Sequence, residues 1–239
     1  MVKIEIANNQ SCKHAIDMCK KILQWFEENH VQIISDKPLV LYFDETLNCP
    51  KFLSSENIGC PFDLIYINLK DDNKWDQLLF QLSHELCHYV IYLNNRGDYH
   101  MIKWIEESIC EAFSLFCLKK WSIEWNVIGY PFINKDYGRR MNFYRKTHMD
   151  EKTMHPSLMD NINMSVLLEI DNLSETDRLR RHDFVCQLSD LISKQSISKL
   201  IDYQKYRYSD LLLDTEQYDD LNNDAVHFIC EIQNKIRKD

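Results

Sequence analysis

Hydrophobic and polar positions follow two periods along this chain, and these periods predict its elements. Short apolar runs rich in β-branched and aromatic residues predict strands at residues 2–7, 39–43 and 64–69. Apolar positions repeating every three or four residues predict helices at 11–29, 73–93 and 101–121. The pattern is helical again from about residue 161, with a last helix over 219–237. The sequence therefore predicts an α+β fold, with a small mixed sheet followed by a mainly helical C-terminal half.

Residues 126–160 differ from the segments on either side. They contain two of the four glycines together with Pro131 and Pro156, and their periodicity is weak. Such a stretch is typical of a long loop or of an insertion that covers a cleft. We therefore expect one domain over residues 1–125, followed over 126–239 by a flexible segment and a helical subdomain. The second part either forms its own core or shares that of the first.

Charge and cysteine usage narrow the classes of function. The formal net charge is −9, from 37 acidic and 28 basic residues, which argues against nucleic acid as a partner. No apolar run approaches the ~20 residues of a membrane span, and the N-terminus lacks the pattern of a signal peptide. The nine cysteines are scattered and never spaced as C-x-x-C. Free thiols in a reducing cytoplasm fit this usage better than disulfides.

Candidate chemistry is concentrated in the helix predicted over 73–93. It contains His84-Glu85-Leu86-Cys87-His88, which reads H-E-x-x-H. Residues four apart share a helix face, so the imidazoles of His84 and His88 can bind one metal ion. Glu85 lies between them, where its carboxylate can take a proton from a water molecule at the metal. The pentapeptide predicts a metal site, but it fixes only three positions.

A catalytic zinc site usually takes three protein ligands and leaves one position open. The next predicted helix offers the third ligand in Glu107, with 18 residues between it and His88. A turn and an antiparallel helix fit that interval and would return Glu107 toward the histidines. Its neighbour Glu106 is the competing ligand, and Glu107 is in the better register.

These residues resemble the gluzincin metallopeptidases, in which H-E-x-x-H is followed after about eighteen or nineteen residues by a glutamate ligand. The likeness is greatest to the aminopeptidase N-like branch, because Trp104-Ile105-Glu106-Glu107-Ser108 matches its Trp-Leu-Asn-Glu-Gly-type segment. It covers residues 62–121. The resemblance implies a zincin-like sheet packed on two zinc-binding helices. It also implies Zn2+ bound by His84, His88 and Glu107, Glu85 as the general base, and Glu111 orienting a zinc-bound histidine.

The resemblance has further implications for the substrate. It implies that a peptide adds to an edge strand just before the first zinc helix, here Phe62 to Leu69. The Gly-Ala-Met-Glu-Asn-type segment that binds a free amine is not found upstream of His84, which leaves endo- and exopeptidase activity both open. The family also stabilises the oxyanion with a downstream Tyr or His. The candidates here are Tyr137, Tyr144, His148, His155 and His182, and we prefer Tyr137.

Two alternatives remain open at this point. An ImmA/IrrE-like regulatory protease also contains H-E-L-x-H and would move the third ligand to Glu111, because Glu111-Ala112-Phe113 is similar to its Glu-Ala-Asn segment. A non-catalytic protein-interaction domain could hold a structural zinc, although binding alone does not require Glu85. The sequence thus predicts a cytoplasmic zinc metallopeptidase that hydrolyses a peptide or protein substrate, with its oligomeric state open.

Overall fold

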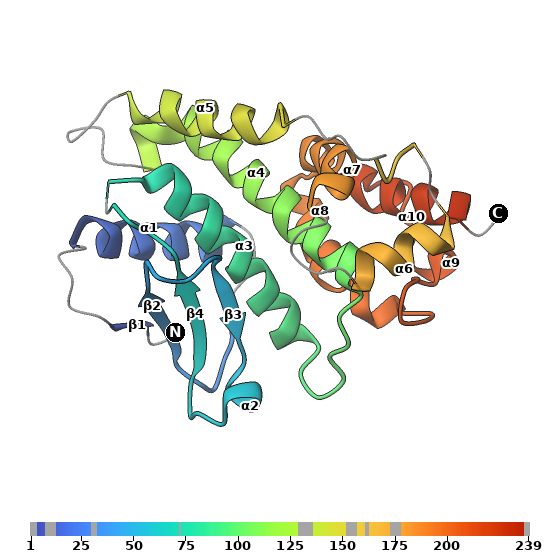
Figure 1. Ribbon diagram of the computed structural model, residues 1–239, viewed down its shortest axis with the longest axis horizontal. Coiled ribbons are helices and arrows are strands. Elements are labelled where there is room, and N and C mark those ends of the chain that lie inside the picture. Colours follow the sequence, from blue (N-terminus) through green and yellow to red (C-terminus); the bar gives the residue numbers. More distant parts are fainter. Residues whose placement is uncertain are drawn as a thin grey trace. The chain divides into compact units, whose positions relative to one another are not determined.

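The computed structural model describes residues 4–7, 13–29, 33–71, 73–128, 136–151, 157–160, 163–172 and 178–236. They form two compact units, each built from two stretches of chain. The first is Met1–Leu93 with Cys117–Arg145, and the second is Asn94–Phe116 with Lys146–Asp239. The first unit contains a sheet with helices and the second is helical (Figure 1). The predicted α+β class is confirmed.

The sheet of the first unit is four-stranded and mixed. Its strands are β1 (Ile4–Ala7), β2 (Leu39–Phe43), β3 (Lys51–Leu53) and β4 (Asp63–Ile67). They lie in the order β1-β2-β4-β3, with β1, β2 and β4 parallel and β3 antiparallel to β4. The sequence predicted all of them except the three-residue β3.

This strand order corrects one expectation about the substrate. The strand before the first zinc helix, expected over Phe62 to Leu69, is β4, and it pairs with β2 on one side and with β3 on the other. Because its backbone groups serve both neighbours, β4 is not an edge strand. The edge on this side of the sheet belongs to β3.

Two long helices continue the first unit. α1 spans Lys13–Asn29 and α3 spans Trp75–Asn94, and both follow the predicted periodicity closely. A short helix, α2 (Ser55–Ile58), stands between β3 and β4. The sheet packs on α3 through Phe52, whose ring lies 5.4 Å from that of Tyr89 and 5.5 Å from that of Tyr92, centroid to centroid. This contact holds the helix that carries the H-E-x-x-H segment.

Of the two alternatives for residues 126–160, the long loop is wrong for the part that the structure describes, because that part is mainly helical. α4 runs from Lys103 to Ile128, beyond its predicted end, and Tyr137–Met149 forms the helix α5. The buried positions of α5 include Gly138, where a Cβ would lie 2.6 Å from the carbonyl oxygen of Ser122. Only glycine allows the two backbones this close an approach.

Besides the first part of α4, the second unit contains helices of four to 14 residues. They are α6 (Met164–Asn172), α7 (Arg178–Leu191), α8 (Lys194–Ile201), the 3-10 helix η2 (Tyr203–Tyr206), α9 (Thr215–Tyr218) and α10 (Asp224–Ile236). α10 is amphipathic and packs its apolar face on α7, α8 and α9.

Two other expectations concern the chain as a whole. None of the described helices is long and apolar enough to cross a lipid bilayer. The eight cysteines that the structure describes are free thiols, and five of them are buried. Burial raises the pKa of the Cys117 thiol well above its usual range, so this cysteine stays protonated as a small apolar side chain.

Candidate metal centre

His84 and His88 lie one turn apart on α3, as the spacing predicts. Both faces of this helix are covered, so His88 is buried and His84 is half-buried. Their Nε2 atoms are 3.2 Å apart, and the ring planes make an angle of 63°. Two neutral imidazoles can share only one N–H···N bond, whereas a metal ion can accept both nitrogens at once.

Glu107 of α4 completes the group. One ligand atom from each of His84, His88 and Glu107 lies within 4.8 Å of the others. Two imidazoles and one carboxylate are the donor set of a catalytic zinc site. A tetrahedral ion with Zn–N bonds of about 2.0–2.1 Å would place its two nitrogens about 3.3 Å apart, close to the spacing here. The three residues therefore fit a metal ion in chemistry, and the histidine pair also fits in separation.

Glu85 belongs to the same helical turn as the histidines. Its side chain is buried, with only 4% of its surface exposed. A carboxylate at that depth is shielded from bulk water. Its place between His84 and His88 is the one that the sequence assigned to a general base.

Glu106, the competing ligand, is fully buried and has different partners. Its carboxylate accepts hydrogen bonds from the hydroxyls of Tyr99 (2.7 Å) and Tyr203 (2.5 Å) and from the side-chain amide of Gln204 (3.1 Å). Burial and this negative charge raise the pKa of both phenols, which keeps them as donors. Consecutive helical residues point about 100° apart, so Glu106 faces these donors while Glu107 joins the histidines.

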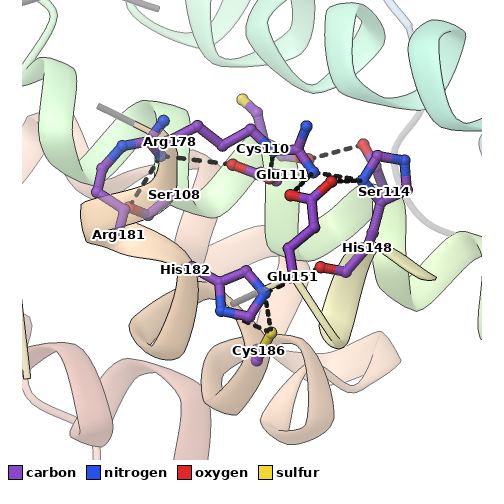
Figure 2. A network of polar contacts seen from close by, with 10 residues as sticks. All are labelled: Ser108, Cys110, Glu111, Ser114, His148, Glu151, Arg178, Arg181, His182 and Cys186. Atoms are coloured by element: carbon purple, nitrogen blue, oxygen red, sulfur yellow. Dashed lines mark hydrogen bonds and ion pairs between the residues drawn. The ribbon is translucent and has the colours of Figure 1, made fainter. Parts of the chain in front are cut away.

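Glu111 contacts arginines. Arg178 Nε lies 2.5 Å from its Oε1, and Arg181 Nη1 lies 3.8 Å from its Oε2 (Figure 2). We expected this carboxylate to orient a zinc-bound histidine, but the contacts described for it place both oxygens on guanidinium groups. The alternative in which Glu111 is the third ligand meets the same difficulty. Its side chain is 8% exposed, so these arginines compensate a buried charge.

The arginine contacts extend to His148. Arg178 Nη2 contacts His148 Nδ1 and lies 3.2 Å from Glu151 Oε2 (Figure 2). Burial and the positive charge of Arg178 lower the pKa of His148 to about 4. Because a guanidinium only donates, the Nδ1 that faces it carries no proton, so the ring is neutral with its hydrogen on Nε2. His182 donates from Nε2 to the His148 carbonyl oxygen, 2.9 Å away.

Tyr137, the preferred oxyanion donor, lies at the first turn of α3. Its hydroxyl accepts from the backbone N–H of Trp75 (2.6 Å) and lies 2.9 Å from Asp76 Oδ1. These bonds satisfy backbone donors that a helix N-terminus leaves without partners. His84 is nine residues further along the helix, or about 13 Å at 1.5 Å per residue. The structure thus does not bring Tyr137 to the histidines.

Two candidates for the oxyanion donor remain, Tyr144 and His155. Tyr144 packs edge-on against Phe80, with ring centroids 6.0 Å apart, and His155 lies outside the described residues. Sequence reasoning missed Arg178 and Tyr203 as neighbours of the acidic residues of α4. Arg178 lies 67 positions from Glu111 and Tyr203 lies 97 from Glu106, and no periodic pattern links such distant residues.

The assignment of a family cannot come from relatives. Comparison of the chain with protein-family models, with curated proteins and with solved structures gave no match. What the chain shows by itself is an α+β fold with a His84, His88 and Glu107 group that could hold a metal ion.

Proposed function

We propose that this chain is a zinc-dependent metallopeptidase of the gluzincin type. The observation that supports the proposal is the convergence of His84, His88 and Glu107 within 4.8 Å, with Glu85 buried on the same turn as the histidines. The pairing of Glu106 with hydroxyls and of Glu111 with arginines supports Glu107 as the third ligand. The same contacts make the ImmA/IrrE-like register less favourable.

The side chains divide the chemistry between them. His84 and His88 through Nε2, and Glu107 through its carboxylate, would hold the ion. When bound, zinc supplies a Lewis acid that polarises a carbonyl group and lowers the pKa of water. Glu85 then serves as the general base, taking a proton from the attacking water and passing it to the leaving amine. Its buried carboxylate and its place between the histidines suit that role.

We propose His148 in place of Tyr137 as the oxyanion donor. Glu111 lies one turn from Glu107, and Arg178 contacts both Glu111 and His148. The lowered pKa keeps His148 neutral near pH 7, with its proton on Nε2. A neutral N–H donor is suited to the negative charge that develops on the carbonyl oxygen. Tyr137 instead has its hydroxyl at the start of α3.

The strand order also suggests where a peptide would pair. Because β3 occupies the edge, an extended substrate would add to Lys51–Leu53 rather than to β4. A three-residue strand offers few main-chain hydrogen bonds. Binding would therefore depend mainly on the side chains of the substrate.

The test compares wild-type protein with Glu85→Gln, which keeps the size of the side chain and removes the base. Both are assayed for zinc content by elemental analysis and for cleavage of a mixed peptide library by mass spectrometry. We expect one zinc per chain in both, and a rate lower by about 10²–10⁴-fold in Glu85→Gln.

Two outcomes would contradict the proposal. Wild-type protein that retains one zinc but cleaves no peptide would favour the non-catalytic protein-interaction domain. Wild-type protein without stoichiometric zinc, after purification without chelators and addition of Zn2+, would overturn the metal centre itself.

A further inference from the structure

A polar cluster forms hydrogen bonds with the N-terminal part of α4, and its side chains have no role in the proposed hydrolysis. We name the side chains of Tyr99, Glu106, Tyr203 and Gln204 the Glu106 clasp. All of them belong to the second unit, as does Glu107. Glu106 and Tyr203 are fully buried, and Gln204 is 9% exposed.

The clasp holds one carboxylate by several donors. Tyr203 donates to Oε2 at 2.5 Å, Gln204 donates to the same oxygen at 3.1 Å, and Tyr99 donates to Oε1 at 2.7 Å. Hydrogen bonds to an ionised acceptor are stronger than neutral ones and more demanding in geometry. Each carboxylate oxygen therefore has a donor in a defined direction, and the rotation of α4 about its own axis is restrained at residue 106.

Further bonds join the clasp to the backbone just before α4. The amide N–H of Ile102 donates to Tyr203 Oη at 3.3 Å, and that of His100 donates to Gln204 Oε1 at 3.1 Å. The connection that leads into α4 and the first turns of the helix are thus tied to the same two residues of η2. The axial position of the helix is restrained together with its rotation.

We infer that the Glu106 clasp positions Glu107 as the third metal ligand, an inference that rests on the proposed function. Glu107 is the next residue along the helix, so its direction and height follow from those of Glu106. A shift of one side of the helix by about 1 Å would move the carboxylate by a large fraction of a 2.0–2.2 Å Zn–O bond. Partners that orient a ligand in this way commonly contribute ~10–100-fold to metal affinity.

The experiment removes the hydroxyl donors without changing the shape of the site. Tyr99→Phe, Tyr203→Phe and the double variant are compared with wild type and with Tyr218→Phe. Tyr218 is a matched control, because its ring is as buried as that of Tyr203 and its hydroxyl donates to the Lys199 carbonyl at 3.5 Å, away from α4. Zinc affinity is measured by competition with a chromophoric chelator.

The visible spectrum of the Co2+-substituted protein is recorded in parallel. It reports coordination number, because a four-coordinate ion absorbs much more strongly than one with more ligands. We expect zinc affinity to fall ~10–100-fold in the double variant. We also expect its cobalt bands to weaken, because a loosened carboxylate lets additional water bind and raises the coordination number. Tyr218→Phe should stay within about threefold of wild type, with an unchanged spectrum.

Folding is checked by circular dichroism and by unfolding without metal. If the double variant does not fold, the two single variants carry the same comparison with Tyr218→Phe. Clasp variants that bind zinc as tightly as the control, with the wild-type cobalt spectrum, would show that the clasp does not position Glu107. The proposed metal centre would not be affected by that result. A wild-type chain that binds no zinc would overturn both.

Discussion

Two stretches of α4 meet their surroundings with different kinds of side chain. From Lys103 to Phe116 the helix carries three glutamates with different surroundings. Glu106 accepts from hydroxyls, Glu107 belongs to the group that could hold a metal ion, and Glu111 pairs with arginines. From Cys117 to Ile128 its buried positions include Trp121 and Trp125, which make ring contacts. A buried carboxylate needs specific donors or cations, whereas a buried ring needs mainly volume. The first stretch is therefore suited to chemistry and the second to stability.

The largest expected effects come from replacing two glutamates of the first stretch, Glu107 and Glu111, by alanine. Glu107→Ala should lower zinc affinity by more than ~100-fold, beyond the range of an outer partner, with little change in unfolding without metal. Glu111→Ala should keep zinc but destabilise the fold by about 3–5 kcal/mol, because Arg181, with a side chain only 7% exposed, loses its carboxylate. Chelator competition and urea unfolding measure the two effects. If Glu111→Ala lost zinc and Glu107→Ala kept it, Glu111 would be the third ligand, as in the ImmA/IrrE-like alternative.

In the second stretch the expected loss is one of stability alone. Trp125 is 1% exposed, and its ring lies 5.8 Å from that of Trp75 and 5.4 Å from that of Tyr137. Trp125→Ala should lower the free energy of unfolding by about 3–5 kcal/mol, while the folded fraction binds zinc as before. Val127→Ala is the matched control, because Val127 is 89% exposed and should change stability by less than about 0.5 kcal/mol. A Trp125→Ala protein that folds but no longer binds zinc would contradict the claim that the second stretch contributes to stability alone.

His148, which contacts the Arg178 partner of Glu111, should make the free energy of unfolding depend on pH. The pKa of His148 falls from 6.5 to about 4 in the folded protein, so below pH 6.5 the unfolded chain binds a proton that the folded one does not. Stability therefore falls as the pH drops from 6.5 to 4, by about 3 kcal/mol in total. Urea unfolding at several pH values should show this loss in wild type but not in His148→Gln. Parallel curves for the two proteins would contradict it.

The smallest expected effect concerns the hydroxyl at the start of α3. Tyr137→Phe removes an acceptor from the Trp75 N–H and should cost about 1 kcal/mol of stability. If its role is only to cap the helix, kcat for a peptide substrate stays the same, whereas His148→Gln lowers kcat by about 10²-fold. A large fall in kcat in Tyr137→Phe alone would return the oxyanion role to this tyrosine.

Local periodicity was enough to predict the long elements and part of the site. α3 places His84 and His88 one turn apart whatever surrounds it, so their pairing could be read from the spacing. Glu107 could be chosen over Glu106 because the interval after His88 matches a known pattern. The structure adds the physical reason for that choice, since the Glu106 carboxylate is already held by donors.

Features that depend on distant contacts could not be predicted in the same way. The buried face of α5 includes Gly138 and Arg145, so its pattern reads as polar and the segment resembles a loop. β3 is too short to show alternation, so the strand that takes the edge place expected for β4 could not be predicted. The arginine partners of Glu111 come from α7, where the sequence pattern predicted only helical structure.

The short strand β3 also bears on how the protein behaves at high concentration. An edge strand presents unpaired backbone groups that can recruit another chain and begin aggregation. Here that edge is only three residues long, and it begins with the exposed charged side chain of Lys51. A short edge with a lysine is poorly suited to growing a sheet from one molecule into the next. The feature that limits how a peptide can pair with this edge of the sheet thus also limits self-association through the same edge.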